Sequence, residues 1–208
     1  MLIIINKMET EESNIKRIML ILLKDFSRAH TITSLAKDLK LTRVGIWKIL
    51  KKLEGNKYIA LRSVGSGKTN TYLMNINWDN IIVEKALVLY LTEEAAKQRR
   101  WRANFADLEQ EVDFLILYGS VLKFPKEAND IDILGVAKKS RFLEIQKKSD
   151  RIQKTQSKKI HSINFTEKEF KEELKKSNKA FIDSIKMGVI LFGHEKFVGF
   201  MKKREKWI

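Results

Sequence analysis

Two aspartates follow a glycine-serine pair in the second half of the chain, at a spacing that suits metal and phosphate chemistry. The apolar run V-D-F-L-I-L-Y ends at Gly119-Ser120, and Asp130 comes ten residues after the serine, followed by Asp132. Because side chains alternate along a strand, both aspartates are expected on one face, with Ile131 on the other. Such carboxylates bind Mg2+ or Mn2+ together with water and substrate phosphates. The pattern predicts a site for a divalent cation and a nucleoside triphosphate.

The glycine-serine pair is expected to hold the phosphates of that nucleotide. Gly119 has no side chain, so the backbone can approach the phosphates closely, and Ser120 with the amide groups after it can bind their oxygens. Metal ions held by the aspartates would stabilise the attacking and leaving oxygens of the reaction. The chemistry that these residues predict is phosphoryl-type transfer assisted by metal.

These residues resemble the minimal nucleotidyltransferases of the DNA polymerase β-like superfamily, whose signature is Gly-Ser, a spacer and Asp-x-Asp at the start of a strand. The resemblance runs from about Ala96 to the C-terminus and includes I-N-F-T-E-K-E-F and G-V-I-L-F-G-H-E-K-F. It implies a short mixed sheet flanked by helices, with Asp130 and Asp132 as catalytic metal ligands. It also implies transfer of a nucleoside monophosphate, often AMP from ATP, to a hydroxyl group of a protein, a nucleic acid or a small molecule.

The chain departs from this family in two places. Relatives usually follow Gly-Ser with x-Ala-Arg-Gly, whereas this chain has V-L-K-F, so that Lys123 keeps the positive charge for nucleotide binding but the glycine is lost. Active relatives also carry a third acid on a later strand, and the candidate strand K-I-H-S-I-N-F offers only His161, Ser162 and Asn164. Without that acid the domain would lack one metal ligand and a general base. A domain that binds nucleotide without turning it over is therefore the alternative.

A second candidate for phosphate binding, V-G-S-G-K-T at residues 64–69, fails the test of context. A phosphate-binding loop needs a glycine five positions before its Gly-Lys pair, where this chain has Arg62, and it needs a helix after it. The following T-Y-L-M-N-I-N alternates as a strand does. The stretch is expected to form the tip of a β-hairpin.

Three helices are expected before this hairpin. Apolar residues recur at helical spacing from Ser13 to Phe26, Thr31 or Thr33 can cap a second helix, and Thr42 can cap a third that ends at Gly55. The order of helices and hairpin resembles a winged helix-turn-helix over roughly residues 12–78.

One position departs from the winged-helix pattern. Relatives usually have a turn glycine where this chain has Lys57, and we expect Asn56 to adopt the left-handed conformation instead.

The winged-helix resemblance implies binding of double-stranded DNA, with the third helix in the major groove and the hairpin against the backbone or minor groove. Arg43 and Lys48 can bind guanine edges or phosphates, and Gly45 is expected to permit close approach. Contact of Trp47 with DNA and its packing against the hairpin both stay open. The predicted DNA-binding residues are Thr42, Arg43, Gly45, Trp47, Lys48, Lys51, Arg62 and Lys68. The alternative for this module is that it binds protein or mediates dimerisation.

The patterns together predict an α+β protein in which a helix joins two domains. We expect a winged helix-turn-helix over residues 1–78, a linker helix over 79–95 and a nucleotidyltransferase-like mixed sheet with flanking helices over 96–208. A long amphipathic helix is expected over residues 93–111.

Composition narrows the classes of function. The 208 residues carry a net charge of +15, which favours polyanionic partners such as DNA, and they include no cysteine, which excludes disulfides and thiolate sites. No apolar run is long enough for a signal peptide or membrane span, so a cytoplasmic protein is expected. Two further alternatives stay open: a non-enzymatic transcriptional regulator that senses nucleotide or dimerises through its second domain, and an antitoxin-like partner of a toxin.

Overall fold

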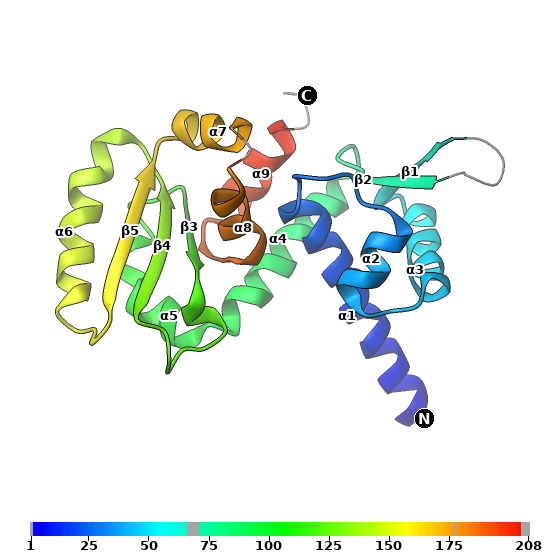
Figure 1. The fold of residues 1–208 in the computed structure, drawn as a ribbon, viewed down its shortest axis with the longest axis horizontal. Helices are drawn as coiled ribbons and strands as arrows, with labels where there is room; N and C mark the ends of the chain where they lie inside the picture. The colour runs from blue at the N-terminus through cyan, green and yellow to red at the C-terminus, as the bar shows by residue number, and fades with distance from the viewer. Residues whose placement is uncertain (1, 66–70, 177, 205–208) are drawn as a thin grey trace. The chain divides into compact units, whose positions relative to one another are not determined.

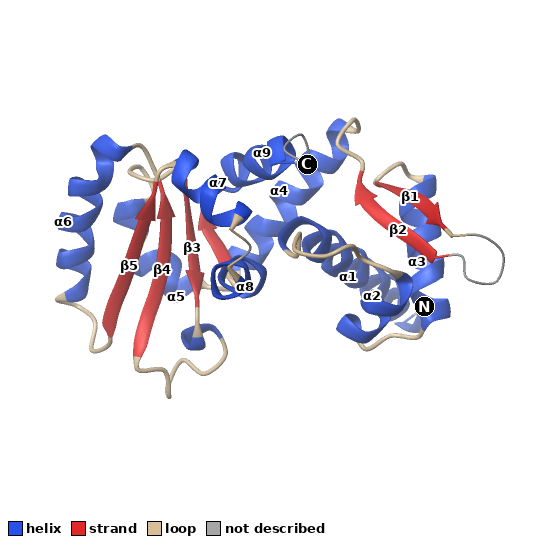
Figure 2. Cartoon of the chain, turned by 45° about the horizontal axis from the view of Figure 1, so that its top comes forward, coloured by secondary structure: helices blue, strands red, loops and turns tan. Residues whose placement is uncertain are grey.

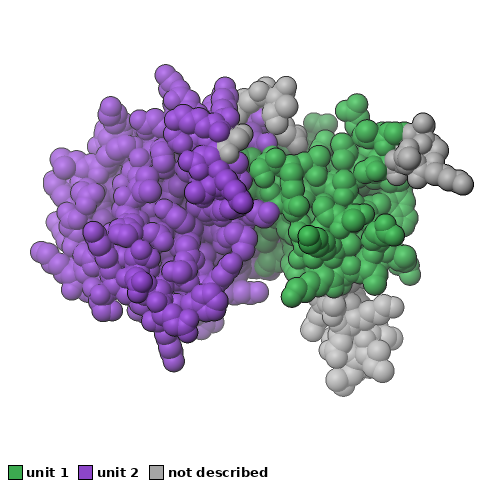
Figure 3. All heavy atoms as spheres, in the orientation of Figure 1, with its two compact units in different colours: residues 1–87 green, residues 88–208 purple. Residues whose placement is uncertain are grey.

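Helices and two β-sheets make up the computed structural model, which describes residues 2–65, 71–176 and 178–204 (Figure 1). The protein is of the α+β class, as expected from the sequence. The chain divides into two compact units, residues 1–87 and residues 88–208 (Figure 3). None of the helices that the structure describes has both the length and the apolar character that a bilayer crossing requires.

Unit 1 consists of three helices followed by a hairpin. Its elements are α1 (Leu2–Lys24), α2 (Ile32–Leu39), α3 (Arg43–Gly55), β1 (Ile59–Val64) and β2 (Thr71–Ile76), and the next helix, α4 (Ile81–Ala96), contains the division between the units. The two strands pair antiparallel. Aliphatic side chains from all three helices and from the hairpin form the core, including the buried Ile18, Leu35, Leu50 and Met74.

Local signals in the sequence set the ends of these helices. The side chain of Thr31 caps α2 in a reciprocal arrangement with Ser34, and Thr42 caps α3 by accepting a hydrogen bond from the amide of Gly45 at 3.0 Å. These caps satisfy amide groups that the first turn of a helix leaves without a partner. They therefore fix the start of α3, on which most of the predicted DNA-binding residues lie.

The prediction that Asn56 takes the left-handed conformation is wrong. Asn56 has a φ of −83°, whereas Lys57 itself has a φ of 57°. The carbonyl of Lys57 accepts hydrogen bonds from the side-chain amides of Asn77 (2.9 Å) and Asn80 (3.1 Å). These long-range bonds hold Lys57 in a conformation that costs a side-chain-bearing residue about 1 kcal/mol or more.

Unit 2 is built on a four-stranded mixed sheet in the order β5-β4-β3-β6 (Figure 2). The strands are β3 (Phe114–Tyr118), β4 (Asp130–Val136), β5 (Lys159–Phe165) and β6 (Val189–Phe192). Strand β4 runs parallel to β5 and antiparallel to β3, and β3 is also antiparallel to β6. The described helices of this unit, after α4, are α5 (Arg99–Asn104), α6 (Phe142–Gln153), α7 (Glu167–Lys175), α8 (Lys179–Met187) and α9 (His194–Arg204).

Apolar residues cover both faces of this sheet. On one face, Trp101 of α5, Phe105 just after it and Ile145 of α6 form a core with odd-numbered strand residues such as Leu117 and Ile133. The other face carries a cluster of phenylalanines in which Phe114 of β3 packs against residues of α7 and α9. The cluster consists of Phe114, Phe165, Phe170, Phe181, Phe197 and Phe200. The alternation of β3 and β4 places Tyr118 and Asp132 on this second face, opposite one another in the register.

The prediction of a single long helix over residues 93–111 is wrong. Helix α4 ends at Ala96, α5 covers only Arg99–Asn104, and a short 3-10 helix follows at Ala106–Leu108. After the break between Ala96 and Arg99, Trp101 and Phe105 pack into the same core of unit 2 as Ala95.

Stability should depend on pH through His194, the first residue of α9. Its Nε2 donates a hydrogen bond to the carbonyl of Ile190 at 2.9 Å, and burial lowers the pKa of the imidazole. A lowered pKa means that the unfolded chain binds the proton more readily, so the free energy of unfolding should fall as the pH drops through the ordinary histidine range. We expect the melting temperature of His194→Gln to fall less between about pH 7.5 and pH 5 than that of the native chain. Equal slopes would mean that His194 does not contribute.

Candidate functional site

Asp130 and Asp132 come together at the end of the sheet where β3 stops and β4 and β5 begin. Both carboxylates lie close to one imidazole: Nδ1 of His161 is 3.4 Å from Oδ2 of Asp130 and 3.4 Å from Oδ1 of Asp132. The shared neighbour places the two aspartates on the same face of β4. The side chains are 34% and 22% exposed, so a ligand can reach them from solvent.

The third member of this group, His161, comes from β5. The parallel register pairs it with Asp132, which puts it where a later strand could have supplied a third acid. Ligand atoms of Asp130, Asp132 and His161 all lie within 4.8 Å of one another. The donor set of two carboxylates and one imidazole fits a divalent cation, since oxygen ligands suit Mg2+ and Mn2+ and imidazole suits transition metals. Ser162 and Asn164 of the same strand pair with Ile133 and Gly135, so their side chains lie on the other face of the sheet from His161.

The carboxylate of Asp132 stands in an environment that resists its negative charge. Burial raises the pKa of Asp132, the nearby Asp130 raises it further, and His161 opposes the shift. Burial also raises the pKa of Tyr118, whose hydroxyl would have to ionise beside the same two aspartates. A cation bound at the pair would relieve this repulsion.

Gly119 lies against Asp132. It has a φ of 83°, and a β-carbon at this position would lie 2.3 Å from Oδ2 of Asp132. The conformation favours glycine, and an added β-carbon would push the Asp132 carboxylate out of its present position. The result is a bend at the end of β3 that leaves the carboxylate uncovered by a neighbouring side chain.

Ser120 and Lys123, the other residues predicted to bind nucleotide, follow this bend. A 3-10 helix over Ser120–Leu122 packs beside β4, and its carbonyl at Ser120 accepts hydrogen bonds from the amides of Lys123 and Phe124. Both side chains are exposed. In the part of the chain that the structure describes, neither side chain forms a hydrogen bond or ion pair, so both are free to bind an anion.

A second cluster of potential metal ligands, in unit 1, has a different character. Asp25, His30 and Asp38 also lie within 4.8 Å of one another. However, the guanidinium of Arg28 donates to Asp25 at 3.0 Å and also contacts Asp38. An arginine thus already neutralises these carboxylates, whereas the described residues provide no lysine or arginine that pairs with Asp130 or Asp132.

The predicted DNA-binding residues of unit 1 divide into free and engaged side chains. Arg43, Lys48 and Arg62 are exposed, and none of them has an ion-pair partner among the residues that the structure describes. Lys51, in contrast, pairs with Glu54 at 2.7 Å. Lys68 lies outside the described residues.

Trp47 packs against the hairpin. Its ring centroid is 5.0 Å from that of Tyr72 in β2, and Nζ of Lys51 lies 4.8 Å from the indole centroid. The packing of Trp47 against the hairpin is therefore confirmed, and its contact with DNA stays a prediction. The structure also gives a local reason for Gly45, because a β-carbon there would come within 3.2 Å of the capping oxygen of Thr42.

A recess of about 510 Å³ lies beside these residues. Its lining comes from the start of α2, the outward side of α3 and the start of β2: Thr31, Ile32, Thr33, Arg43, Val44, Trp47, Thr71 and Tyr72. Val44 stands 66% exposed at its edge. An exposed aliphatic side chain next to a free arginine can contact both a thymine methyl and a guanine edge.

The sequence did not assign His161 and Tyr118 to the site. Their place follows from the pairing of β4 with β5 and of β3 with β4, which brings both residues into register with Asp132. The chain carries no local signal for that register. Comparisons with protein-family models, with curated proteins and with solved structures give no match.

Proposed function

We propose that unit 2 is a metal-dependent nucleotidyltransferase that moves a nucleoside monophosphate, most simply AMP from ATP, to a hydroxyl group. The observation that supports this proposal best is the group of Asp130, Asp132 and His161 beside the bend at Gly119. Paired carboxylates next to an open backbone bend suit a nucleoside triphosphate that carries a divalent cation.

Asp130, Asp132 and His161 are the residues that would hold the cation. Bound there, it would supply electrostatic stabilisation of the charge that develops on the triphosphate. Ser120 would donate hydrogen bonds to phosphate oxygens, and the exposed ammonium group of Lys123 would offset their charge. Gly119 would leave room for the phosphates to approach Asp132.

The direct test is incubation of the full chain with ATP labelled at the α-phosphate, with either Mg2+ or Mn2+. We expect label to become covalently attached to an acceptor, which can be the chain itself or a molecule added from a cell extract. Retention of all label in ATP, AMP and inorganic products under both metals would contradict the transferase proposal.

Replacing His161 by aspartate should change the metal preference. An imidazole ligand favours Mn2+ over Mg2+, whereas three carboxylates would suit Mg2+. We expect the native chain to transfer label faster with Mn2+, and His161→Asp to raise the Mg2+ rate relative to the Mn2+ rate by about tenfold, equivalent to ~1.4 kcal/mol. Initial rates with each metal give this ratio, and an unchanged ratio would show that His161 is not a ligand.

A non-enzymatic regulator is the second candidate, and His161 is the observation that favours it. Without a third carboxylate, the site can bind nucleotide and metal and yet lack the base that an acceptor hydroxyl needs. In that case ATP with Mn2+ would raise the melting temperature and change the affinity for DNA, with no label transferred.

We also propose that unit 1 binds double-stranded DNA as a winged helix-turn-helix, with α3 in the major groove. The free charges of Arg43, Lys48 and Arg62 support this proposal, together with the net charge of +15. The alternative, in which this unit binds protein or dimerises, would leave DNA affinity unaffected by these side chains.

Arg43→Ala should weaken binding to a duplex by about 1–3 kcal/mol. It should also reduce the slope of log affinity against log salt concentration by about one. Lys85→Ala is the matched control, since Lys85 is an exposed cation of α4 within unit 1 and has no partner among the described residues. Fluorescence anisotropy with a pool of random duplexes, followed by selection of preferred sequences, measures both effects. Equal losses in the two variants would indicate diffuse attraction rather than binding through α3.

A further inference from the structure

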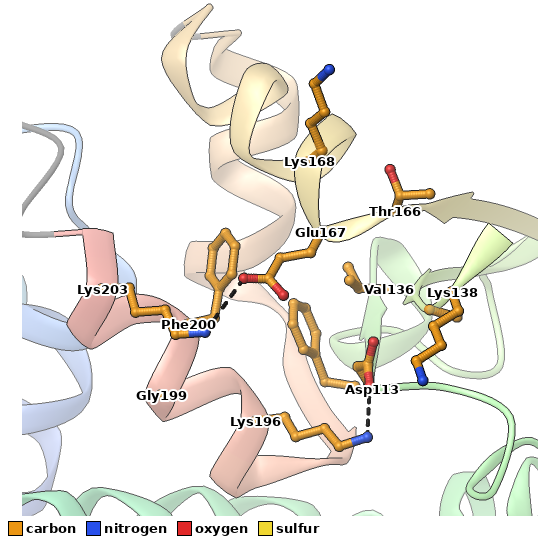
Figure 4. A pocket seen from close by; sticks show the side chains of 12 residues that line it. Asp113, Val136, Lys138, Thr166, Glu167, Lys168, Lys196, Gly199, Phe200 and Lys203 are labelled. Atoms are coloured by element: carbon orange, nitrogen blue, oxygen red, sulfur yellow. Dashed lines mark hydrogen bonds and ion pairs between the residues drawn. The ribbon is translucent and has the colours of Figure 1, made fainter.

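A hollow of about 530 Å³ lies at the opposite end of the unit 2 sheet from the aspartates (Figure 4). Residues that follow the carboxyl ends of the parallel strands β4 and β5 line it, together with Asp113 before β3 and one side of α9. Strand β4 separates it from Asp130 by about 20 Å, given the rise of a strand. It is therefore distinct from the candidate nucleotide site.

The lining of this hollow is positively charged. Four lysines surround it, namely Lys138, Lys168, Lys196 and Lys203, against the two carboxylates Asp113 and Glu167. Each carboxylate already has a partner: Lys196 reaches Asp113 at 2.6 Å, and Lys203 reaches Glu167 at 3.7 Å. The balance of four positive and two negative charges leaves a net charge of +2.

Lys138 is the lysine of the lining that is best placed to bind an anion. It is exposed, and no ion pair or hydrogen bond of its side chain is found within the described ranges. Figure 4 shows Lys138 extending toward the side where Lys196 reaches Asp113, whereas Lys168 points away from Glu167 and Phe200. An anion between Lys138 and Lys196 would thus meet two ammonium groups.

The floor of the hollow is apolar. Phe114 and Phe200 are almost fully buried and belong to the phenylalanine cluster, and Val136 and Ala137 complete this part of the lining. A ligand that combines an anionic group with a small apolar group would match this rim and floor. The volume lies in the range of small-molecule sites, not of surfaces that bind a duplex.

Gly199 leaves its part of the α9 side of the hollow without a side chain. It lies within α9, where glycine costs about 1 kcal/mol relative to alanine. A β-carbon there would find nothing within 4 Å, so neither crowding nor a positive φ requires glycine. The missing side chain keeps the hollow open on the side of α9.

The start of α7 adds hydrogen-bond donors. Thr166 and Glu169 form a reciprocal cap, which occupies the carboxylate of Glu169 and leaves the amides of Glu167 and Lys168 without a partner inside the helix. Thr166, Glu167 and Lys168 all line the hollow. Two backbone donors therefore stand beside the lysines and support the binding of an anion.

We propose that this hollow binds a small phosphate monoester. Such an ester carries close to two negative charges at neutral pH, which matches the net charge of the lining. Lysines bind phosphate as compact point charges, and the phenylalanine floor would accept the organic part of the ester. The proposal does not depend on nucleotidyl transfer, because the two sites lie at opposite ends of the sheet.

Phenyl phosphate is a suitable probe, with phenyl sulfate as a probe of similar shape and a single charge. Calorimetric titrations should use the full native chain without divalent metal, so that the paired carboxylates of Asp130 and Asp132 repel the phosphate from the candidate nucleotide site. We expect one phenyl phosphate per chain, bound at least about tenfold more tightly than phenyl sulfate. No binding of phenyl phosphate at millimolar concentrations would overturn the proposal.

Three further variants locate the binding. Lys138→Ala should weaken phenyl phosphate binding by about tenfold, and Gly199→Leu should abolish it by filling the hollow with no change of charge. Lys154→Ala is the control, since Lys154 is exposed at the end of α6, does not line the hollow and removes the same charge. A loss as large in Lys154→Ala as in Lys138→Ala would overturn the proposal in favour of diffuse attraction. A loss of duplex affinity in Lys138→Ala and Gly199→Leu, with phenyl phosphate binding intact, would also overturn it and assign the hollow to nucleic acid.

Discussion

Replacing Asp132 by asparagine should lower the rate of nucleotidyl transfer by at least about a thousandfold. Loss of one metal-binding carboxylate removes several kcal/mol of stabilisation from the transition state, and each ~1.4 kcal/mol is a factor of ten in rate. Asparagine has nearly the same shape, so the packing around β4 should persist. Initial rates of label transfer from ATP measure the effect. Asp183→Asn is the control, because Asp183 is exposed on α8 and is not a member of the metal-binding group.

The same substitution should not destabilise the metal-free protein. Burial, followed by the charge of Asp130, raises the pKa of Asp132, so the folded chain holds the ionised carboxylate less readily than the unfolded chain does. This destabilising effect begins as the pH rises through the ordinary aspartate pKa and is complete above the raised pKa, hence at neutral pH. With a chelator present at neutral pH, Asp132→Asn should melt at the same temperature as the native chain or higher.

Addition of Mn2+ then separates the two roles of Asp132. The cation should raise the melting temperature of the native chain and not that of the variant, because only the native chain binds it. If Asp132→Asn instead melts several degrees lower without metal, the aspartate stabilises the fold and the loss of rate carries no information about catalysis.

Gly193→Ala should have the largest effect on folding of any single methyl group added to unit 2. Gly193 joins β6 to α9 with a φ of 77°, and a β-carbon there would lie 1.9 Å from the carbonyl oxygen of Asp113 and 2.7 Å from Cα of Phe114. Both neighbours are backbone atoms of the segment that leads into β3, so no side chain can move aside. We expect a loss of at least about 3 kcal/mol in the free energy of unfolding.

Gly199→Ala is a matched control for this prediction. The same methyl group is added six residues later, inside α9 and into open space, and it should stabilise the chain by up to about 1 kcal/mol. Thermal unfolding and the yield of folded protein compare the two variants. Similar melting temperatures for Gly193→Ala and the native chain would show that the bend after β6 is looser than the structure indicates.

Predictions from the sequence succeeded where the signal was local. Threonines at positions 31 and 42 cap their helices because a side-chain oxygen needs to reach only two or three residues along the chain. Period-2 alternation placed Asp130 and Asp132 on one face for the same reason, and the structure brings both to His161. The predictions for Asn56 and for a helix over residues 93–111 failed where distant groups intervened. Side chains of Asn77 and Asn80 hold Lys57 in the left-handed conformation, and the helix breaks after Ala96 where Trp101 and Phe105 enter the core of unit 2.

The sequence by itself therefore determined the α+β class, the helix caps of unit 1 and the pairing of two aspartates on one strand. Only the tertiary structure decided what stands beside that pair. The parallel register of β4 and β5 sets His161 against Asp132, and the end of β3 sets Gly119 there as well. The hollow at the other end of the sheet also gathers residues from four separate segments. The physical reason is that alternation and capping act between near neighbours, whereas strand register and packing depend on the burial of many side chains at once.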